Sequence, residues 1–177
     1  MMGMKTLGAW PSAHGPAAVV DFKDIDEELR FLRTMVTQYR QAPQIRDLAV
    51  GIVRNSGAPA RDKKAQAIAL ANWVKTNIFY IHELPERFQL PTETLRLKAG
   101  DCDDHTTLLA SMMESVGIPS SLVCMEVNGQ WAHIFPAAVM KNGAHLHLDT
   151  TAKSGDLGQN PVTYAQERGK RVRLKIA

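Results

Sequence analysis

The chain has 177 residues, of which 45% are hydrophobic and 22% charged, and its formal net charge is +3. These values are typical of one globular domain that buries a real core. No run approaches the roughly 18 consecutive apolar residues of a membrane span, and residues 1–20 lack the continuous apolar region of a signal peptide. Cys102 and Cys124 are too few for a disulfide framework. We therefore expect one cytoplasmic domain, residues 1–177, without a membrane partner.

The basic excess is concentrated in the last eleven residues, 167–177. Within this tail Val172, Leu174 and Ile176 alternate with basic residues, which is the pattern of a strand with one buried and one solvated face. The rest of the chain is close to neutral. The basic residues of the tail therefore indicate a solvent-exposed strand face, and we expect no nucleic-acid partner.

The N-terminal half is predicted to be helical. Residues 1–21, rich in Gly, Pro and Ala, read as an extended arm, and 24–98 as the helical part. Three helices with one apolar face each are expected at 24–40, 43–55 and 60–77. Asp24 with Glu27 has the spacing of a capping box, and Pro43 opens the second helix. Trp73, inside the third helix, and Tyr80 are expected to be core aromatics.

Two short segments connect these helices to the next one. Residues 79–82 read as an extended segment, and 83–91 as a polar loop that contains Pro85 and Pro91. Thr92 is expected to cap a single helical turn over 93–98.

A further helix is predicted over 102–117, beginning at Cys102. Apolar residues recur along it at helical spacing: Leu108, Leu109, Met112, Met113 and Val116. Gly117 and Pro119 end it. A thiol at a helix N-terminus faces backbone N–H groups and the positive end of the helix dipole, which favours the thiolate.

After Pro119 the pattern changes to that of strands. Residues 121–127, 130–140 and 144–151 are rich in β-formers and are separated by Asn128-Gly129 and Asn142-Gly143. Asn-Gly between such runs predicts β-hairpins. The expected fold class is therefore α+β, with N-terminal helices and a central Cys-bearing helix packed on an antiparallel sheet of three to four strands in 119–177.

These strands carry two residues that complement Cys102. A cysteine nucleophile needs a base to take its proton, and the base needs a carboxylate to orient it. His133 and Asp149 lie on neighbouring predicted strands and supply both roles. A two-residue Asn142-Gly143 turn would set Asp149 opposite Pro136, with His133 on the other face. A three-residue loop, 141–143, sets Asp149 opposite Phe135, on the face of His133. We therefore predict that loop, or an equivalent bulge near Pro136.

The motifs around these residues resemble the transglutaminase-like superfamily, relatives of the papain-like cysteine proteases. They are Gly100-Asp-Cys-Asp-Asp, the Gly-Ile-Pro after the helix, a His after an aromatic on a strand, and Leu148-Asp-Thr-Thr at a strand end. The resemblance implies that Cys102 is the nucleophile, His133 the general base and acid, and Asp149 the residue that orients the imidazole.

The resemblance implies a bacterial or phage-type thiol hydrolase that acts on a peptide, isopeptide or other amide bond of a protein or peptide substrate, without a cofactor. Acyl transfer to an amine stays open, as does a catalytically silent binding or assembly module of a bacterial or phage particle. The Cys102 N–H is one expected oxyanion donor and the Tyr80 hydroxyl a candidate for the second. Oligomeric state cannot be predicted.

Other clusters of polar residues have simpler interpretations. Asp101, Asp103 and Asp104 are favoured as helix-capping and first-turn acids over a calcium site. A zinc site from His145 and His147 with His133 and Asp149 is disfavoured, because Asp149 already has a role. His105 is expected to be a packed core histidine, and Cys124 a small buried apolar residue. We therefore predict no metal.

Overall fold

The computed structural model describes residues 22–82, 88–152, 157–158, 163, 166 and 169–177. Among these residues, the helices and strands with defined bounds follow in the order α1 (Ile25–Tyr39), α2 (Pro43–Asn55), α3 (Lys63–Asn77), β1 (Phe79–Tyr80), α4 (Pro91–Leu97), β2 (Ala99–Gly100), α5 (Cys102–Ser115), β3 (Ser120–Val127), β4 (Gln130–Val139), β5 (His145–His147) and β6 (Val172–Ile176). The predicted arm, 1–21, lies outside the described residues. None of the helices in the described ranges is both long and apolar enough to cross a membrane.

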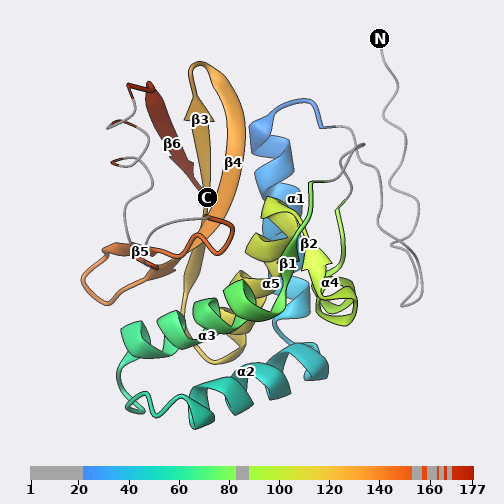
Figure 1. The fold of residues 1–177 in the computed structure, drawn as a ribbon, viewed down its shortest axis with the longest axis vertical. Helices are drawn as coiled ribbons and strands as arrows, with labels where there is room; N and C mark the ends of the chain where they lie inside the picture. The colour runs from blue at the N-terminus through green and yellow to red at the C-terminus, as the bar shows by residue number, and fades with distance from the viewer. Residues whose placement is uncertain (1–21, 83–87, 153–156, 159–162, 164–165, 167–168) are drawn as a thin grey trace.

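A four-stranded antiparallel sheet in the order β5-β4-β3-β6 forms one side of the molecule. The helices lie against its other side and below it (Figure 1). The α+β class, the four strands and the strand in the tail are as predicted, and Asn128-Gly129 forms the expected two-residue turn between Val127 and Gln130. Asn128 and Gly129 both have positive φ, 53° and 90°, as this type of hairpin turn requires.

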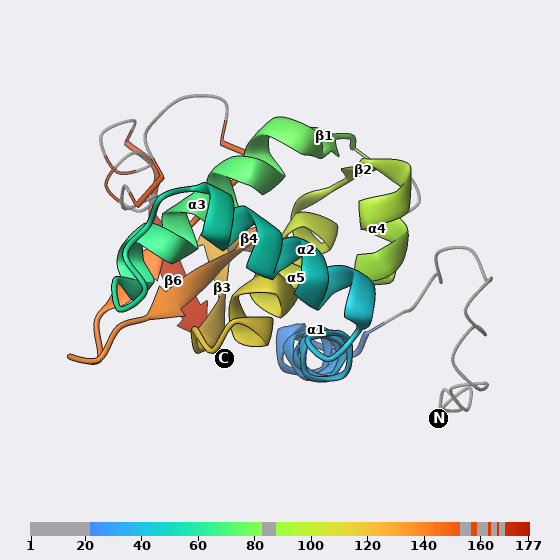
Figure 2. The same ribbon diagram turned by 90° about the horizontal axis from the view of Figure 1, so that it is seen from below.

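Helix α5 is the central element, surrounded by α1, α2, α3 and α4 and by strands β3 and β4 (Figure 2). Residues 103–113 are all buried, so α5 is enclosed on every side and is not the one-faced helix that its apolar spacing predicted. Its polar residues in this stretch therefore need internal partners.

Three apolar clusters hold these layers together. One joins α2 and α3 to the C-terminal half of α5, with Leu70 and Leu109 at its centre. The second joins α1 to α5 and one face of the sheet, with Leu32 and Cys124 among its members. The third lies on the opposite sheet face around Phe135.

The N-terminal helices differ from prediction mainly at their ends. Asp24 caps α1 as expected, accepting the Glu27 N–H at 2.9 Å, but the Glu27 carboxylate accepts from Lys23 and not from Asp24. Helix α3 begins at Lys63 instead of residue 60, because Asp62 caps it by accepting the Ala65 N–H at 2.9 Å. Its buried face is Ala67, Leu70, Ala71 and Val74, which leaves Ile68 and Trp73 only half-buried.

The segment before α5 was predicted least well. Helix α4 begins at Pro91 and not after Thr92, with Leu90 as its N-cap, and ends at Leu97, with Lys98 as its C-cap at φ 58°. The predicted polar loop ends in two buried residues, Phe88 and Gln89. Residues 99–100 form β2, which pairs in parallel with β1 in a separate two-stranded sheet.

Candidate active site

The start of α5 is fixed by the carboxylate of Asp104. This buried side chain accepts the Gln89 N–H at 2.8 Å, the Gln89 side-chain amide at 2.9 Å and the Asp101 N–H at 3.3 Å. A Cβ at Gly100 would lie 2.6 Å from the Asp104 Cβ. Glycine at position 100 is therefore needed to let the chain pass Asp104 and place Cys102 at the first position of the helix.

The acidic residues around Cys102 divide into two kinds. Asp101 and Asp104 form a capping box, so the expected capping role is confirmed for this pair. Asp103 is buried, and burial, together with the charges of Asp104 and Asp101, raises its pKa well above the ordinary value. Among the described residues, ligand atoms of Asp101, Cys102 and Asp103 form the single group compact enough to hold a metal, all within 4.8 Å. Asp101 already serves as the N-cap of α5, which favours the helix-start interpretation.

His133 and Asp149 are in direct contact. The His133 Nε2 lies 2.8 Å from the Asp149 Oδ2, and both side chains are largely buried. The other carboxylate oxygen, Oδ1, accepts the Thr151 N–H at 3.0 Å and its hydroxyl at 2.8 Å. Burial alone raises the pKa of Asp149, but the hydrogen bonds and the charge of His133, together with the bonds from Thr151, outweigh it and lower the pKa. Asp149 is therefore an ionised partner for the imidazole.

The predicted register of this hairpin is confirmed. Ala137 pairs with His147 and Val139 with His145. The Met140 N–H donates to the Ala144 carbonyl at 2.8 Å, so the loop is the three residues 141–143. Gly143 has φ 79°, as the residue after a type I turn in such a loop does. Continued past β5, this register sets Asp149 opposite Phe135, on the face of His133.

A bulge in β4, which the sequence did not predict, also determines the face of the sheet on which the His133 side chain lies. Met125 pairs with His133 but Glu126 with Trp131, so Ala132 is an extra residue in β4. Trp131 packs with the α1 side of the sheet, whereas the His133 ring lies 5.7 Å from that of Phe135 on the other side. The bulge thus reverses the side-chain alternation between positions 131 and 133.

The first turn of α5 contacts both strands that carry these residues. The Thr106 hydroxyl lies 3.2 Å from the Ile134 carbonyl oxygen, next to His133. The His105 Nδ1 lies 2.9 Å from the Thr150 hydroxyl oxygen, next to Asp149. Cys102 is therefore held at the end of a helix that is bonded to the strand of His133 and to the segment of Asp149.

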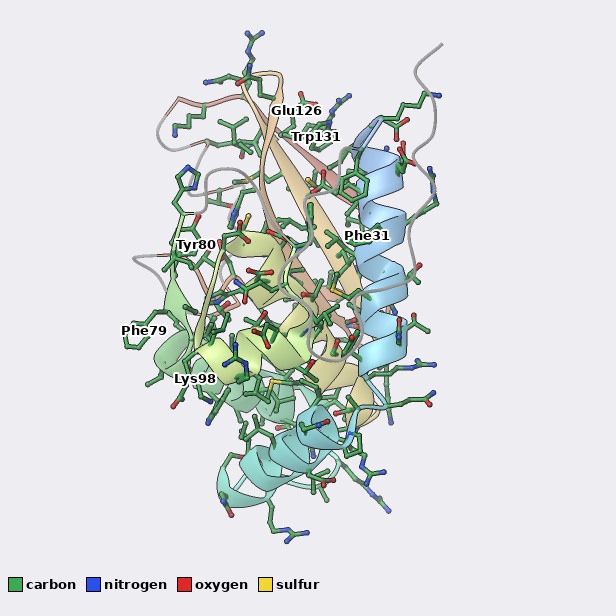
Figure 3. All side chains as sticks on the ribbon, turned by 90° about the vertical axis from the view of Figure 1, so that its right-hand side faces the viewer. Phe31, Phe79, Tyr80, Lys98, Glu126 and Trp131 are labelled. Carbon is green, nitrogen blue, oxygen red and sulfur yellow. The ribbon has the colours of Figure 1, made fainter. Side chains whose placement is uncertain are left out.

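Tyr80 lies beside this group and is not the core aromatic that was expected, since it is 47% exposed. Its ring is 6.2 Å from that of His105. Burial raises the pKa of its hydroxyl, and so do the charges of Cys102, Asp101, Asp103 and Asp149. Phe79, the residue before Tyr80, is 73% exposed, and in Figure 3 its side chain points away from the molecule. Tyr80 is thus a neutral phenol within electrostatic range of both Cys102 and Asp149.

The remaining polar candidates are structural. Cys124 is 3% exposed, and burial raises its pKa to about 12, so it is an inert thiol as predicted. His105 is buried, as predicted. The His145 Nδ1 lies 2.9 Å from the Ser121 hydroxyl oxygen, and in the described part of the chain neither His145 nor His147 belongs to a group of three metal-ligating side chains.

Several residues that build the site were missed from the sequence. The sequence pattern places Gln89 in a polar loop and indicates no role for Thr106 or Thr150. One sequence signal indicates such residues: polar side chains at helix positions that the apolar spacing predicts to be buried. A buried polar group needs a hydrogen-bond partner, so these side chains are expected to bond to other segments.

Comparisons with known proteins agree with this architecture. The family model of the transglutaminase-like superfamily matches residues 46–150, and the chain belongs to this superfamily. No curated protein matches the chain.

Two solved structures share the fold at low sequence identity. One is "a Putative Cysteine Protease from Cytophaga hutchinsonii", with a TM-score of 0.54 and 15% identity over 83% of this chain and 53% of that one. The other is "a putative protease from Parabacteroides distasonis", with a TM-score of 0.53 and 14% identity over 70% of this chain and 26% of that one. The chain thus spans about half and about a quarter of these two proteins.

Proposed function

We propose that the protein is a thiol hydrolase of peptide, isopeptide or related amide bonds, with Cys102 as nucleophile, His133 as general base and acid, and Asp149 as the residue that orients His133. The observation that carries this proposal is the 2.8 Å contact between His133 and an ionised Asp149. The strand of His133 and the segment of Asp149 are both bonded to the first turn of the helix that begins with Cys102. The superfamily and the names of the two structural neighbours support a function of the cysteine-protease kind.

The geometry divides the work between the two imidazole nitrogens. Asp149 engages Nε2, which leaves Nδ1 to exchange protons with the thiol and the substrate. Nδ1 takes the proton of the Cys102 thiol, and the sulfur attacks the carbonyl carbon of the substrate. The carbonyl electron pair moves onto oxygen, giving a tetrahedral oxyanion. The backbone N–H of Cys102 and the neutral hydroxyl of Tyr80 are the candidate donors to this oxyanion.

Collapse of the intermediate re-forms the carbonyl and breaks its C–N bond while Nδ1–H protonates the leaving amine. The product is a thioester on Cys102. His133 then takes a proton from water, the hydroxide adds to the thioester, and the sulfur leaves as thiolate. If an amine takes the place of water, the same steps form a new amide. Product analysis with and without an added primary amine separates hydrolysis from transfer.

The test of the nucleophile is the pH dependence of alkylation. A thiol that transfers its proton to an oriented imidazole reacts with iodoacetamide well below pH 8. We expect Cys102 to be carboxamidomethylated at pH 6 while Cys124 is spared, as read by peptide mass spectrometry. If Cys102 reacts only as an ordinary thiol with a pKa near 8.5 would, the chain is a silent binding module instead.

Asp149→Asn tests the orienting role. Loss of the carboxylate charge removes the stabilisation of imidazolium, and we expect turnover to fall by about 10³–10⁴-fold and low-pH alkylation of Cys102 to be lost. Thr151→Val is the matched control, because it removes the 2.8 Å hydroxyl contact to Asp149 but keeps the charge. Equal effects of the two variants would contradict the assignment.

A further inference from the structure

The hydroxyl of Thr106 links the backbone of Cys102 to the strand of His133. Its oxygen lies 2.6 Å from the Cys102 carbonyl oxygen and 3.2 Å from the Ile134 carbonyl oxygen. Thr106 is 1% exposed, so water does not compete for these contacts. A threonine hydroxyl has one proton, which these two carbonyl groups share.

The Ile134 carbonyl is available to Thr106 because β5 ends early. The backbone groups of Pro136 and Met140 bond to the β5 side, through Leu148 and Ala144. Ile134 lies two residues before Pro136, so its carbonyl faces the same edge of β4. β5 pairs only from His145 to His147, and the first turn of α5 occupies the position beyond its end.

A second contact fixes the same turn to the segment of Asp149. The His105 Nδ1 and the Thr150 hydroxyl oxygen are 2.9 Å apart, and both residues are buried. Adjacent helix residues therefore reach strand β4 and the segment that follows β5, and each contacts a residue next to one that we assign to catalysis.

We infer that Thr106 and Thr150 are positioning residues of the proposed reaction: their hydroxyls hold the Cys102 end of α5 in register with His133 and Asp149. This inference rests on the proposed function. Catalytic groups held in a productive geometry lose up to about 10²-fold in rate when they move by about 1 Å. Neither hydroxyl touches substrate in this scheme, and each acts through the residue beside it.

Valine and serine substitutions separate positioning from stability. Thr106→Val keeps the side-chain volume but removes the hydroxyl, whereas Thr106→Ser keeps the hydroxyl. We expect Thr106→Val to lower the rate of Cys102 alkylation at pH 6 by about tenfold or more, and Thr106→Ser to restore it. Rates are measured where circular dichroism and protection of Cys124 show that the variant is folded.

Thr107→Val is the matched control. Thr107 is equally buried in the same turn, but its hydroxyl bonds to the Asp104 carbonyl, 3.2 Å away, within the helix. We expect this variant to lose stability while it keeps the alkylation profile of the wild type. Thr150→Val tests the second contact, between His105 and Thr150, and Thr150→Ser should restore the rate. This pair also tests the inference if Thr106→Val does not fold.

The outcomes distinguish this inference from the proposed function. Wild-type Cys102 that lacks low-pH reactivity overturns both. Wild-type reactivity that persists in Thr106→Val, or in Thr150→Val where Thr106→Val does not fold, overturns the positioning roles alone. Equal losses in Thr106→Val and Thr107→Val mean general damage to the helix, which also overturns them.

Discussion

The imidazole of His105 is kept neutral by its position in the first turn of α5. It is 1% exposed, and burial lowers its pKa to about 4, although the nearby backbone of Phe79 and the charges of Asp101 and Asp149 oppose the shift. The Nδ1 atom of a neutral ring can either donate to or accept from the Thr150 hydroxyl. Protonation would place a cation in the buried interior, which is unfavourable.

This pKa predicts that His105 makes the fold sensitive to acid. The unfolded chain takes up a proton near pH 6.5 but the folded chain only near pH 4. The contribution of His105 to stability is therefore complete above pH 6.5 and is lost as the pH falls toward 4, by about 3 kcal/mol in all. Asp103, with its raised pKa, contributes in the opposite direction, so the wild-type curve alone does not isolate the histidine.

The variant His105→Asn isolates the contribution of His105 to the pH dependence of stability. We predict that the free energy of unfolding of the wild type, measured in urea relative to this variant, falls by about 3 kcal/mol between pH 7 and pH 4. A difference that stays constant with pH would show that His105 takes up its proton at the same pH in the folded and the unfolded chain.

At the level of the element, the start of α5 depends on the close approach of Gly100 to Asp104. A methyl group at position 100 would meet the Asp104 Oδ2 at 2.7 Å, and Asp104 cannot withdraw without releasing Gln89 and Asp101. We predict that Gly100→Ala destabilises the protein by about 1–3 kcal/mol and slows alkylation of Cys102. Thermal unfolding and mass spectrometry measure the two effects.

Gly51, inside α2, provides the opposite case. No atom lies within 4 Å of a Cβ built there, and glycine is a poor residue for a helix interior. Gly51→Ala should stabilise by about 0.5–1 kcal/mol. If both alanine variants shift the unfolding temperature in the same direction, the close approach at Gly100 is not what requires glycine.

The elements that were predicted correctly are those whose signals are local. The starts of α1 and α2 follow from Asp24 and Pro43, and the 141–143 loop follows from Asn142-Gly143 with the pairing that it requires. The β1–β2 pair and the bulge at Ala132 were not predicted, because parallel pairing and bulges depend on contacts between distant segments. Tyr80 was misplaced for the same reason: the same aromatic pattern suits a core strand and a site edge.

At the scale of the whole molecule, α5 is enclosed by the surrounding elements, so each of its polar residues needs a particular hydrogen-bond partner. Asp104, His105 and Thr106 lie where water cannot satisfy them, and each is bonded to a different segment: to Gln89, to Thr150 and to Ile134. Leaving any of these groups without its partner would cost about 1–3 kcal/mol. The same contacts that stabilise the central helix therefore also set the position of Cys102.

Strand β6 closes the sheet on the side away from this site. It pairs with β3 from Val123 to Val127, and the Ala177 backbone exchanges hydrogen bonds with Leu122 at 2.7 and 2.9 Å. Leu174 packs against the cluster of Val123, Phe135 and Ala137. β6 therefore protects an apolar strand whose backbone groups would otherwise be open to pairing with another chain.

Removal of residues 172–177 should turn β3 into an exposed edge. We predict a lower unfolding temperature and, by light scattering, self-association that increases with protein concentration and exceeds that of the full chain. Because the deletion also removes two cations, the control is the full-length double variant Arg173→Gln, Lys175→Gln, which keeps the strand and loses the same charge. Self-association of this control to the same extent would assign the effect to charge, whereas a truncated protein that behaves as the full chain does would show that β6 does not protect the β3 edge.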